Sequence, residues 1–168
     1  MGFNISRHMV PELIKLEMQT ELPDVPENGS RKKWVVESKE LLLSELIEIL
    51  DPLGKIGNRK KLLLDFINRE KKASTGIGKG FAVPHIRSMQ AKEFMIGFGR
   101  HREGYDFDAI DGQPVRFFFI MAAPPYDDSL YLKVFKSISE LISLDGFGDQ
   151  LMDAEEPFDI IRIIKSLE

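Results

Sequence analysis

The sequence predicts an α/β fold, a three-layer sandwich in which a mixed parallel and antiparallel β-sheet is flanked by helices on both faces. A continuous apolar run at residues 115–123 is typical of a strand buried on both faces. Residues 94–101 place Phe94, Ile96 and Phe98 on one face of a second strand. Elsewhere the apolar residues recur with a helical period, and helices and strands do not alternate strictly, which favours a mixed sheet.

The composition is that of one globular domain with a sizeable core. The chain has 168 residues, of which 43% are hydrophobic and 30% are charged. No apolar run approaches the roughly 20 residues that a membrane helix needs, and no secretory signal is visible, so stable membrane insertion is not expected. The lack of cysteine excludes disulfides and fits a cytoplasmic location. A formal charge of -4 gives no electrostatic case for nucleic acid as a partner.

Residues 1–37 are predicted to be an N-terminal extension that packs on a single domain formed by residues 38–168. Within the extension, residues 13–18 alternate in part between apolar and polar side chains and indicate a strand. Pro23, Pro26 and Gly29 then mark a loop. Two roles for the extension stay open, which are masking of the active face and formation of a homodimer.

Two helices are predicted ahead of a glycine-rich stretch. Ser38 is a good N-cap for a helix over residues 39–50, and Asn58 can cap a helix over residues 59–70. Arg69 then lies in the last turn of the second helix, where the helix dipole favours a cation. Residues 72–80 contain so many glycines that a loop without regular structure is expected.

Three helices are predicted after the apolar strand. Asp127, Asp128 or Ser129 can cap a long helix that ends near residue 144. A short helix over residues 149–153 follows, and Pro157 suits the first turn of the last helix.

His85 is the candidate nucleophile for a phosphoryl group. It follows Pro84 and the short β-like run at residues 81–83. An unperturbed imidazole is mostly neutral near neutral pH and can attack phosphorus when cations and donors hold the phosphate. Arg69 can supply a planar pair of donors, and Ser74 and Thr75 can add hydroxyl groups. The plain alternatives are a structural histidine and an arginine that only stabilises the end of its helix.

No cofactor and no metal site are predicted. The three histidines, at positions 8, 85 and 101, do not have the spacing of metal ligands. The glycine-rich stretch matches neither G-x-x-x-x-G-K-[ST] nor G-x-G-x-x-G, so an ATP or dinucleotide site is not indicated. Its glycines are instead expected to let the backbone turn sharply and expose amide donors.

The segment around His85 resembles a known family. Arg69-Glu70, residues 74–78 and residues 82–85 are similar to the active-site motif of the enzyme IIA proteins of the phosphoenolpyruvate-dependent sugar phosphotransferase system, of the fructose/mannitol/nitrogen-regulatory type. Residues 107–115 resemble the turn of that family into its central strand. The resemblance runs from about residue 38 to the C-terminus and implies the same sandwich fold.

The resemblance implies a phosphotransferase that carries phosphate on His85. The donor would be an HPr-like phosphocarrier protein, and the acceptor a IIB domain, unless the phosphorylation state itself signals to a kinase or transporter. Because no IIB or membrane IIC segment is attached, a regulatory protein is favoured over a sugar-transport subunit. The residues expected to bind the phosphate are Arg69, Ser74, Thr75, Tyr131 and Arg87.

Two positions depart from the family pattern. The family commonly has a histidine where this chain has Tyr131, and a glycine where it has Ile86. A tyrosine can donate a hydrogen bond to phosphate but cannot carry a positive charge, and a branched side chain narrows access to His85. A second hypothesis therefore stays open, a non-catalytic binding module of the same fold that acts on a kinase or transporter without being phosphorylated.

Overall fold

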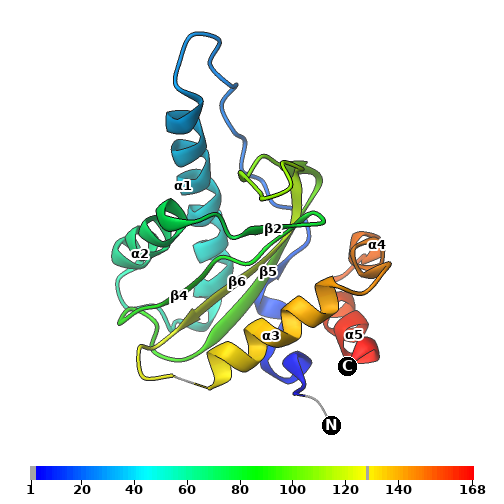
Figure 1. Cartoon of the computed structure of the whole chain (residues 1–168). Helices are drawn as coiled ribbons and strands as arrows, with labels where there is room; N and C mark the ends of the chain where they lie inside the picture. Colours follow the sequence, from blue (N-terminus) through cyan, green and yellow to red (C-terminus); the bar gives the residue numbers. More distant parts are fainter. Residues whose placement is uncertain (1–2, 128) are drawn as a thin grey trace.

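The computed structural model describes residues 3–127 and 129–168, and the first described residues lie close to the C-terminus (Figure 1). The backbone N–H and the hydroxyl of Ser6 both donate to the Glu168 carboxylate at 2.8 Å. The strands are β1 (Ile14–Lys15), β2 (Gly76–Gly78), β3 (Phe81–Ala82), β4 (His85–Arg87), β5 (Met95–Tyr105) and β6 (Val115–Ala123). The helices are α1 (Arg31–Leu50), α2 (Arg59–Lys72), α3 (Leu130–Ile142), α4 (Phe147–Asp153) and α5 (Pro157–Leu167), with short 3₁₀ turns η1 (Ile5–His8), η2 (Pro11–Leu13) and η3 (Asp51–Leu53).

One mixed sheet forms the middle layer. Its strand order is β1-β5-β6-β3-β2, and β4 also pairs with β6 beyond the end of β3. Strands β5 and β6 are antiparallel, whereas β3 and β4 run parallel to β6 and β1 runs parallel to β5. The apolar run predicted to be a doubly buried strand is β6, with the predicted bounds.

Helices cover both faces of this sheet, so the predicted three-layer sandwich is confirmed (Figure 1). On one face, α1 and α2 enclose an apolar cluster that includes Leu46, Phe66 and Phe118. On the other face, α3, α4 and α5 enclose a cluster that includes Phe119 and Ile160. Successive residues of β6 thus enter opposite cores, as the pleat of a strand requires. None of the helices among the described residues is long and apolar enough to cross a membrane.

The first long helix begins earlier than predicted, and the choice of Ser38 as its N-cap is wrong. The Ser30 hydroxyl accepts the backbone N–H of Lys33 at 3.3 Å, and α1 starts at Arg31. Trp34, which is 6% exposed, holds this added part by donating its indole N–H to the carbonyl of Pro23 at 2.7 Å. Ser38 is fully buried inside the helix. The boundary between residues 37 and 38 therefore falls within α1.

The segment ahead of α1 contributes to both cores. Ile5 and Met9 are buried in the cluster under α3 and α5, and Leu13 is buried in the cluster under α1. The predicted strand at residues 13–18 exists, but only Ile14–Lys15 pairs, with Phe98 and Gly99 of β5. These contacts make the segment part of the folded unit.

The remaining predicted elements are present with shifted ends. Asn58 caps α2 as predicted, because its side chain accepts the backbone N–H of Lys61 at 3.0 Å. Asp127 fills the predicted capping role at α3, accepting from the N–H of Leu130 at 3.1 Å, while Asp128 lies outside the described residues. The expectation of an irregular loop over residues 72–80 is wrong in part, because β2 and β3 form a tight hairpin there.

Candidate active site

His85 follows the end of β3 and is the first residue of β4, which pairs with the last three residues of β6. Pro84 has no N–H and separates β3 from β4, while its carbonyl accepts the N–H of Met121 in β6 at 2.9 Å. The N–H of Val83 donates to the carbonyl of Thr75 at 3.0 Å, which ties this crossing to the loop after α2. Carboxyl ends of strands in such sheets are the usual place for ligand sites. Backbone hydrogen bonds of the two preceding residues, Val83 and Pro84, thus fix the position of His85 at this edge of the sheet.

The hydrogen bonding of the His85 ring fixes its chemistry. Nδ1 lies 2.6 Å from the carbonyl oxygen of Val83. Because a carbonyl only accepts, Nδ1 carries the proton, and Nε2 keeps its lone pair. Burial lowers the pKa of His85 from its ordinary 6.5, and the nearby Arg69 guanidinium lowers it further. The ring is therefore neutral at neutral pH, as a nucleophile must be.

Aromatic rings from α3 pack on the same imidazole. The Phe135 ring lies edge-on with its centroid 4.9 Å from that of His85, and the Tyr131 ring lies at 5.8 Å. The His85 side chain is partly buried by these contacts and is not sealed in the core. Ring packing fixes the plane of the imidazole without using its second nitrogen.

Arg69 serves the end of α2 and the histidine together. Its Nη1 donates to the carbonyl of Ala73 at 3.0 Å, which satisfies a carbonyl beyond the last turn of the helix. The charge of the same guanidinium lowers the pKa of His85 and opposes the rise that burial causes in the pKa of Tyr131. The plain and the functional explanation of Arg69 are thus compatible.

Arg87 and Tyr131 form a second cationic contact beside His85. The guanidinium carbon of Arg87 lies 4.8 Å from the centroid of the Tyr131 ring. Burial raises the pKa of the Tyr131 phenol, and the charges of Arg87 and Arg69 oppose that rise. The phenol therefore keeps its proton and can donate it to an anion. The structure brings His85, Arg69, Arg87 and Tyr131 together.

Ser74 and Thr75 lie behind this group, in a buried polar network. The Thr75 side chain is 3% exposed, and its hydroxyl donates to Glu70. The Ser74 hydroxyl accepts from Lys39 Nζ at 3.3 Å and donates to the carbonyl of Phe107 at 3.3 Å. Both hydroxyl protons are already donated within the protein, so the structure does not bring them to the imidazole.

The sequence analysis gave no role to Lys39, and it named Glu70 only as part of the family motif. Lys39 Nζ lies 2.8 Å from Glu70 Oε2, with both side chains buried. Their positions carried a signal, because Lys39 continues the apolar stripe of Leu43 and Leu46, and Glu70 follows Phe66 by one helical turn. A charged residue on an apolar stripe indicates a buried partner.

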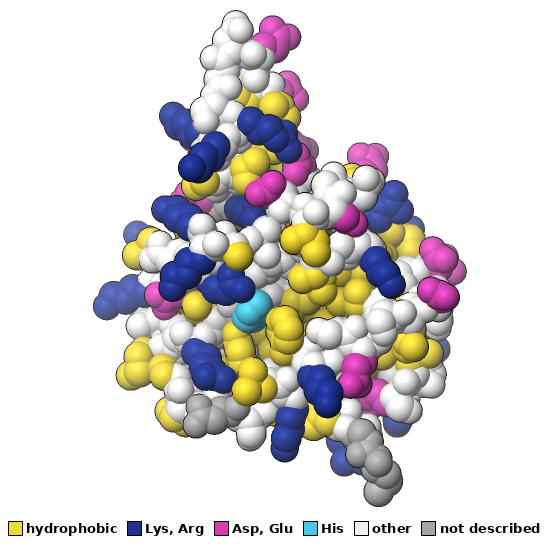
Figure 2. Space-filling model, in the orientation of Figure 1, with side chains coloured by type: hydrophobic (Ala, Val, Ile, Leu, Met, Phe, Trp, Pro, Cys, Tyr) yellow, Lys and Arg dark blue, Asp and Glu magenta, His cyan; other side chains and the backbone are white. Residues whose placement is uncertain are grey.

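Figure 2 shows the face on which α2, β4 and α3 lie in Figure 1. A histidine side chain on this face is bordered by Lys and Arg side chains on one side and by hydrophobic side chains on the other. Among the described residues, no group of three or more His, Asp or Glu side chains could hold a metal ion. The described site is thus the imidazole of His85 with the guanidinium groups of Arg69 and Arg87 near it.

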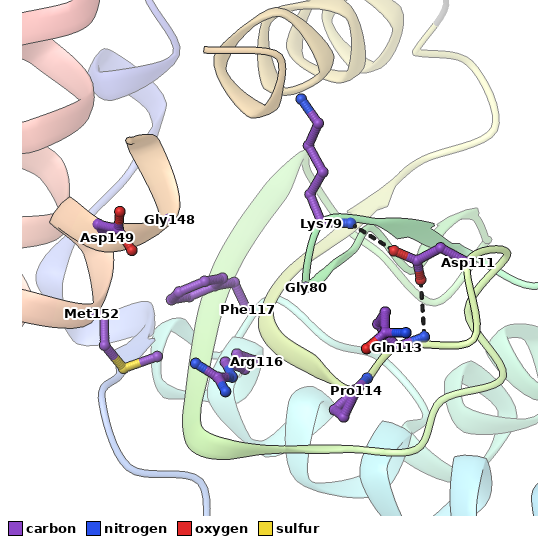
Figure 3. A pocket seen from close by; sticks show the side chains of 10 residues that line it. All are labelled: Lys79, Gly80, Asp111, Gln113, Pro114, Arg116, Phe117, Gly148, Asp149 and Met152. Carbon is purple, nitrogen blue, oxygen red and sulfur yellow. Dashed lines mark hydrogen bonds between the residues drawn. The ribbon is translucent and has the colours of Figure 1, made fainter. Parts of the chain in front are cut away.

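A separate pocket of about 320 Å³ lies at the opposite end of β6 (Figure 3). Its walls include Arg116 and Phe117 of β6 and Asp149 of α4. Asp111 accepts the backbone N–H groups of Lys79 and Gln113, both at 3.1 Å, and so holds the hairpin turn rather than facing the cavity as a free carboxylate. None of the residues grouped around His85 lines this pocket.

The fold and the site define a class, that of small α/β sandwich proteins with a neutral histidine set among arginines. The model of the family described as "Phosphoenolpyruvate-dependent sugar phosphotransferase system, EIIA 2" matches residues 30–167. The chain belongs to this family, and it is an EIIA-type protein of the phosphotransferase system. The resemblance seen in the sequence is confirmed.

Three known proteins show what this chain is similar to in sequence or in fold. The fructose-specific EIIABC component of Bacillus subtilis is 35% identical over 79% of this chain, and the chain spans only 21% of that larger protein. The structure of nitrogen regulatory protein IIA-Ntr from Neisseria meningitidis has a TM-score of 0.73 at 26% identity and covers 95% of this chain and 98% of its own. A complex of enzyme IIAMTL and phosphorylated enzyme IIBMTL from Escherichia coli gives a TM-score of 0.70 at 16% identity, covering 94% of this chain and 97% of that one, which shows the fold alone.

Proposed function

We propose that His85 accepts a phosphoryl group on Nε2 from an HPr-like phosphocarrier protein. The observation that carries the proposal is the neutral ring, with Nδ1–H on the Val83 carbonyl and Arg69 beside it. In the transfer, the Nε2 lone pair forms a bond to phosphorus while the P–N bond of the donor phosphohistidine breaks. The bonding electrons return to the donor ring, so no oxidant or metal is needed.

Arg69, Arg87 and Tyr131 are the groups we assign to the phosphoryl oxygens. Two guanidiniums offset the charge of the transferred group, and the phenol donates a neutral hydrogen bond. Ser74 and Thr75, expected in the sequence to bind phosphate, hold the loop after α2 in this proposal, because Glu70 and the Phe107 carbonyl take their protons.

The acceptor of the phosphate is a IIB domain or a regulated partner. Enzyme IIAMTL, which has the same fold, has been solved in complex with phosphorylated enzyme IIBMTL, and this supports the first route. The similarity to a nitrogen regulatory protein supports the second, in which the phosphorylation state of His85 acts on a kinase or transporter. We infer that these exchanges take place in the cytoplasm, where the phosphocarrier proteins of this family act.

The N-terminal segment has a supporting role in this proposal. Ile5, Met9 and Leu13 are buried, which supports an N-terminal extension that packs on the domain. Sedimentation of the intact protein measures its mass in solution and so tests whether it forms a homodimer. Deletion of residues 1–37 would remove part of α1 and is not a suitable test.

The decisive experiment is phosphorylation with phosphoenolpyruvate, enzyme I and HPr. We expect acid-labile phosphate on the wild type, a ³¹P resonance typical of an Nε2-phosphohistidine, and no label on His85→Gln. His101→Gln is the matched control and is expected to label like the wild type. Label that survives His85→Gln would refute the assignment.

A second candidate function is supported by Tyr131 and Ile86. A partly buried phenol whose pKa burial raises cannot supply a charge of its own. If the wild type takes no label although all three donors are active, the non-catalytic binding module is the better explanation. Binding to a kinase or transporter would then be the same for wild type and His85→Gln.

A further inference from the structure

A groove lies between α1 and α2, and none of the residues grouped around His85 lines it. It has a volume of about 420 Å³, which is in the range of pockets for small ligands. Its apolar lining comes from Val35 and Val36 of α1 and Ile67 of α2, all partly exposed. Its walls therefore come mainly from the two helices, and Asp108 of the loop between β5 and β6 completes them.

The charges around the groove select an anion. Lys39 and Glu70 line it as a buried pair and cancel one another. The remaining charged residues are Lys32, Lys71 and Asp108, all exposed, which leaves a net charge of one positive unit. Among the described residues, neither Lys32 nor Lys71 has an ion-pair partner within 4.0 Å. A ligand with a single negative charge and an apolar body complements this lining.

Hydrogen bonds join the groove to the ring of His85. Thr75 donates its N–H to Glu70 at 3.2 Å, and its carbonyl accepts from the N–H of Val83 at 3.0 Å. The Val83 carbonyl is the acceptor that holds Nδ1–H of His85 at 2.6 Å. Glu70 is thus connected to His85 through Thr75 and Val83, which are joined by one backbone hydrogen bond. A displacement of Glu70 is expected to move the carbonyl that holds the His85 ring.

A second route runs from Lys39 to Arg69. Lys39 Nζ contacts the Ser74 hydroxyl at 3.3 Å, and the adjacent Ala73 carbonyl holds the Arg69 guanidinium at 3.0 Å. Both partners of the buried pair in the groove therefore lie within a few contacts of the proposed phosphate site.

We propose that the groove between α1 and α2 binds a small organic carboxylate with an apolar tail, and that this ligand is coupled to His85 through Lys39 and Glu70. The tail lies on Val35, Val36 and Ile67, and the carboxylate pairs with Lys32 and Lys71. The binding stands without any phosphate chemistry. The coupling to phosphate transfer rests on the function proposed above.

The binding is tested with hexanoate, followed by methyl NMR of Val35, Val36 and Ile67. We expect saturable shifts with hexanoate, binding about tenfold weaker with hexylammonium, and no saturation with acetate in the same range. Equal binding of hexanoate and 1-hexanol would overturn the selection for an anion. Absence of saturable shifts with hexanoate would overturn the site.

Charge variants locate the carboxylate. The double variant Lys32→Gln/Lys71→Gln is expected to weaken hexanoate binding about threefold to tenfold, because two exposed ion pairs are lost. The matched control is Lys33→Gln/Lys72→Gln, which removes the same charge from the same two helices but from residues that do not line the groove. An equal loss in both double variants would show a general charge effect and contradict the assignment.

The coupling is tested in two states of the protein. In the unphosphorylated protein, saturating hexanoate is expected to change the pKa of His85 measured by NMR, and an unchanged pKa overturns the connection. In protein phosphorylated on His85 with phosphoramidate, the hexanoate Kd is expected to change at least about twofold, by the reciprocity of linked sites. If neither phosphoramidate nor phosphoenolpyruvate with enzyme I and HPr modifies His85, the proposed function fails, while the pKa measurement still decides the connection.

Discussion

Among the described residues, two cations are buried, and they are held in opposite ways. Arg100 of β5 is 1% exposed and donates to four carbonyl oxygens, those of Leu16 at 3.1 Å, Leu151 at 2.8 Å, Met152 at 3.2 Å and Ala154 at 2.8 Å. Lys39 of α1 is 7% exposed and contacts the carboxylate of Glu70 at 2.8 Å. In the part of the chain that the structure describes, no carboxylate forms an ion pair with Arg100 within 4.0 Å, whereas Lys39 belongs to one.

The difference separates a structural cation from one connected to the site. The planar guanidinium of Arg100 donates to carbonyls at the C-terminal end of α4, where the helix dipole is negative, and to one carbonyl just after β1. None of its partners leads to His85. The ammonium of Lys39 is a point charge that holds Glu70 and Ser74, and these lead by hydrogen bonds to Val83 and Arg69. Similar burial therefore gives two different consequences on substitution.

Loss of Arg100 should have the largest effect on stability. Arg100→Met leaves several buried carbonyls without donors, each at roughly 1–3 kcal/mol, so we expect unfolding in urea to become easier by about 4 kcal/mol. The pKa of His85 is expected to stay unchanged. Arg102→Met, an exposed neighbour, is the control and should change the stability by less than about 0.5 kcal/mol. A shifted His85 titration in Arg100→Met would remove the contrast between the two cations.

Loss of Lys39 should reduce the free energy of unfolding slightly less than loss of Arg100. Unlike loss of Arg100, it should also disturb the residues connected to His85. Lys39→Met leaves the Glu70 carboxylate buried without its cation, which costs about 3 kcal/mol. Because the lysine is one half of a pair, Lys39→Met/Glu70→Gln should recover about 1 kcal/mol or more of that loss. Urea unfolding of both single variants and the double variant measures the coupling. Strictly additive losses would show that the pair is not energetically linked.

The sheet and most helices could be predicted from local patterns. The nine residues of β6 form an almost unbroken apolar run, which only a doubly buried strand accommodates at that length. The start of α1 could not, because it depends on the bond from Trp34 to the Pro23 carbonyl, between side chain and distant backbone. The β2–β3 hairpin was missed because its glycines, Gly78 and Gly80, adopt positive φ angles that also suit an irregular loop.

The candidate site divides in the same way. His85 and Arg69 stand in a motif, and the sequence placed both. A motif cannot show where a hydroxyl proton goes, so Thr75 was expected at the phosphate although it donates to Glu70. The Lys39–Glu70 pair joins residues 31 positions apart on two helices, and only their position on apolar stripes hinted at it. Directions of side chains across elements are set by packing, which local periodicity does not encode.

Substitution of Arg69 tests whether its positive charge acts on His85. Arg69→Gln should raise the pKa of His85, because the guanidinium disfavours the imidazolium form. NMR titration of the ring measures this, with Lys61→Gln, near the other end of α2, as the charge-matched control. An unchanged pKa would confine Arg69 to its role at the end of α2.

The same shift has a consequence for stability against pH. In the folded wild type the pKa of His85 lies below its ordinary 6.5, so the unfolded chain binds more protons at this side chain in that window. The contribution of His85 therefore destabilises the fold as the pH falls below about 6.5, and the effect disappears above it. Arg69→Gln should make this acid loss smaller, and urea unfolding between about pH 5 and 8 checks the sign.

The smallest effect is expected at Arg87, whose side chain is exposed in contrast to both buried cations. Arg87→Gln removes a charge that opposes the rise in the pKa of Tyr131, so the phenol should titrate at higher pH, as ¹³Cζ NMR of labelled tyrosine can measure. Stability should fall by no more than about 1 kcal/mol, since exposed cation–π contacts are weak. Phosphorylation of His85 should nevertheless slow, because a guanidinium can act on a developing phosphoryl charge without contributing much to the fold. A loss of several kcal/mol would instead place Arg87 with Arg100 among the structural cations.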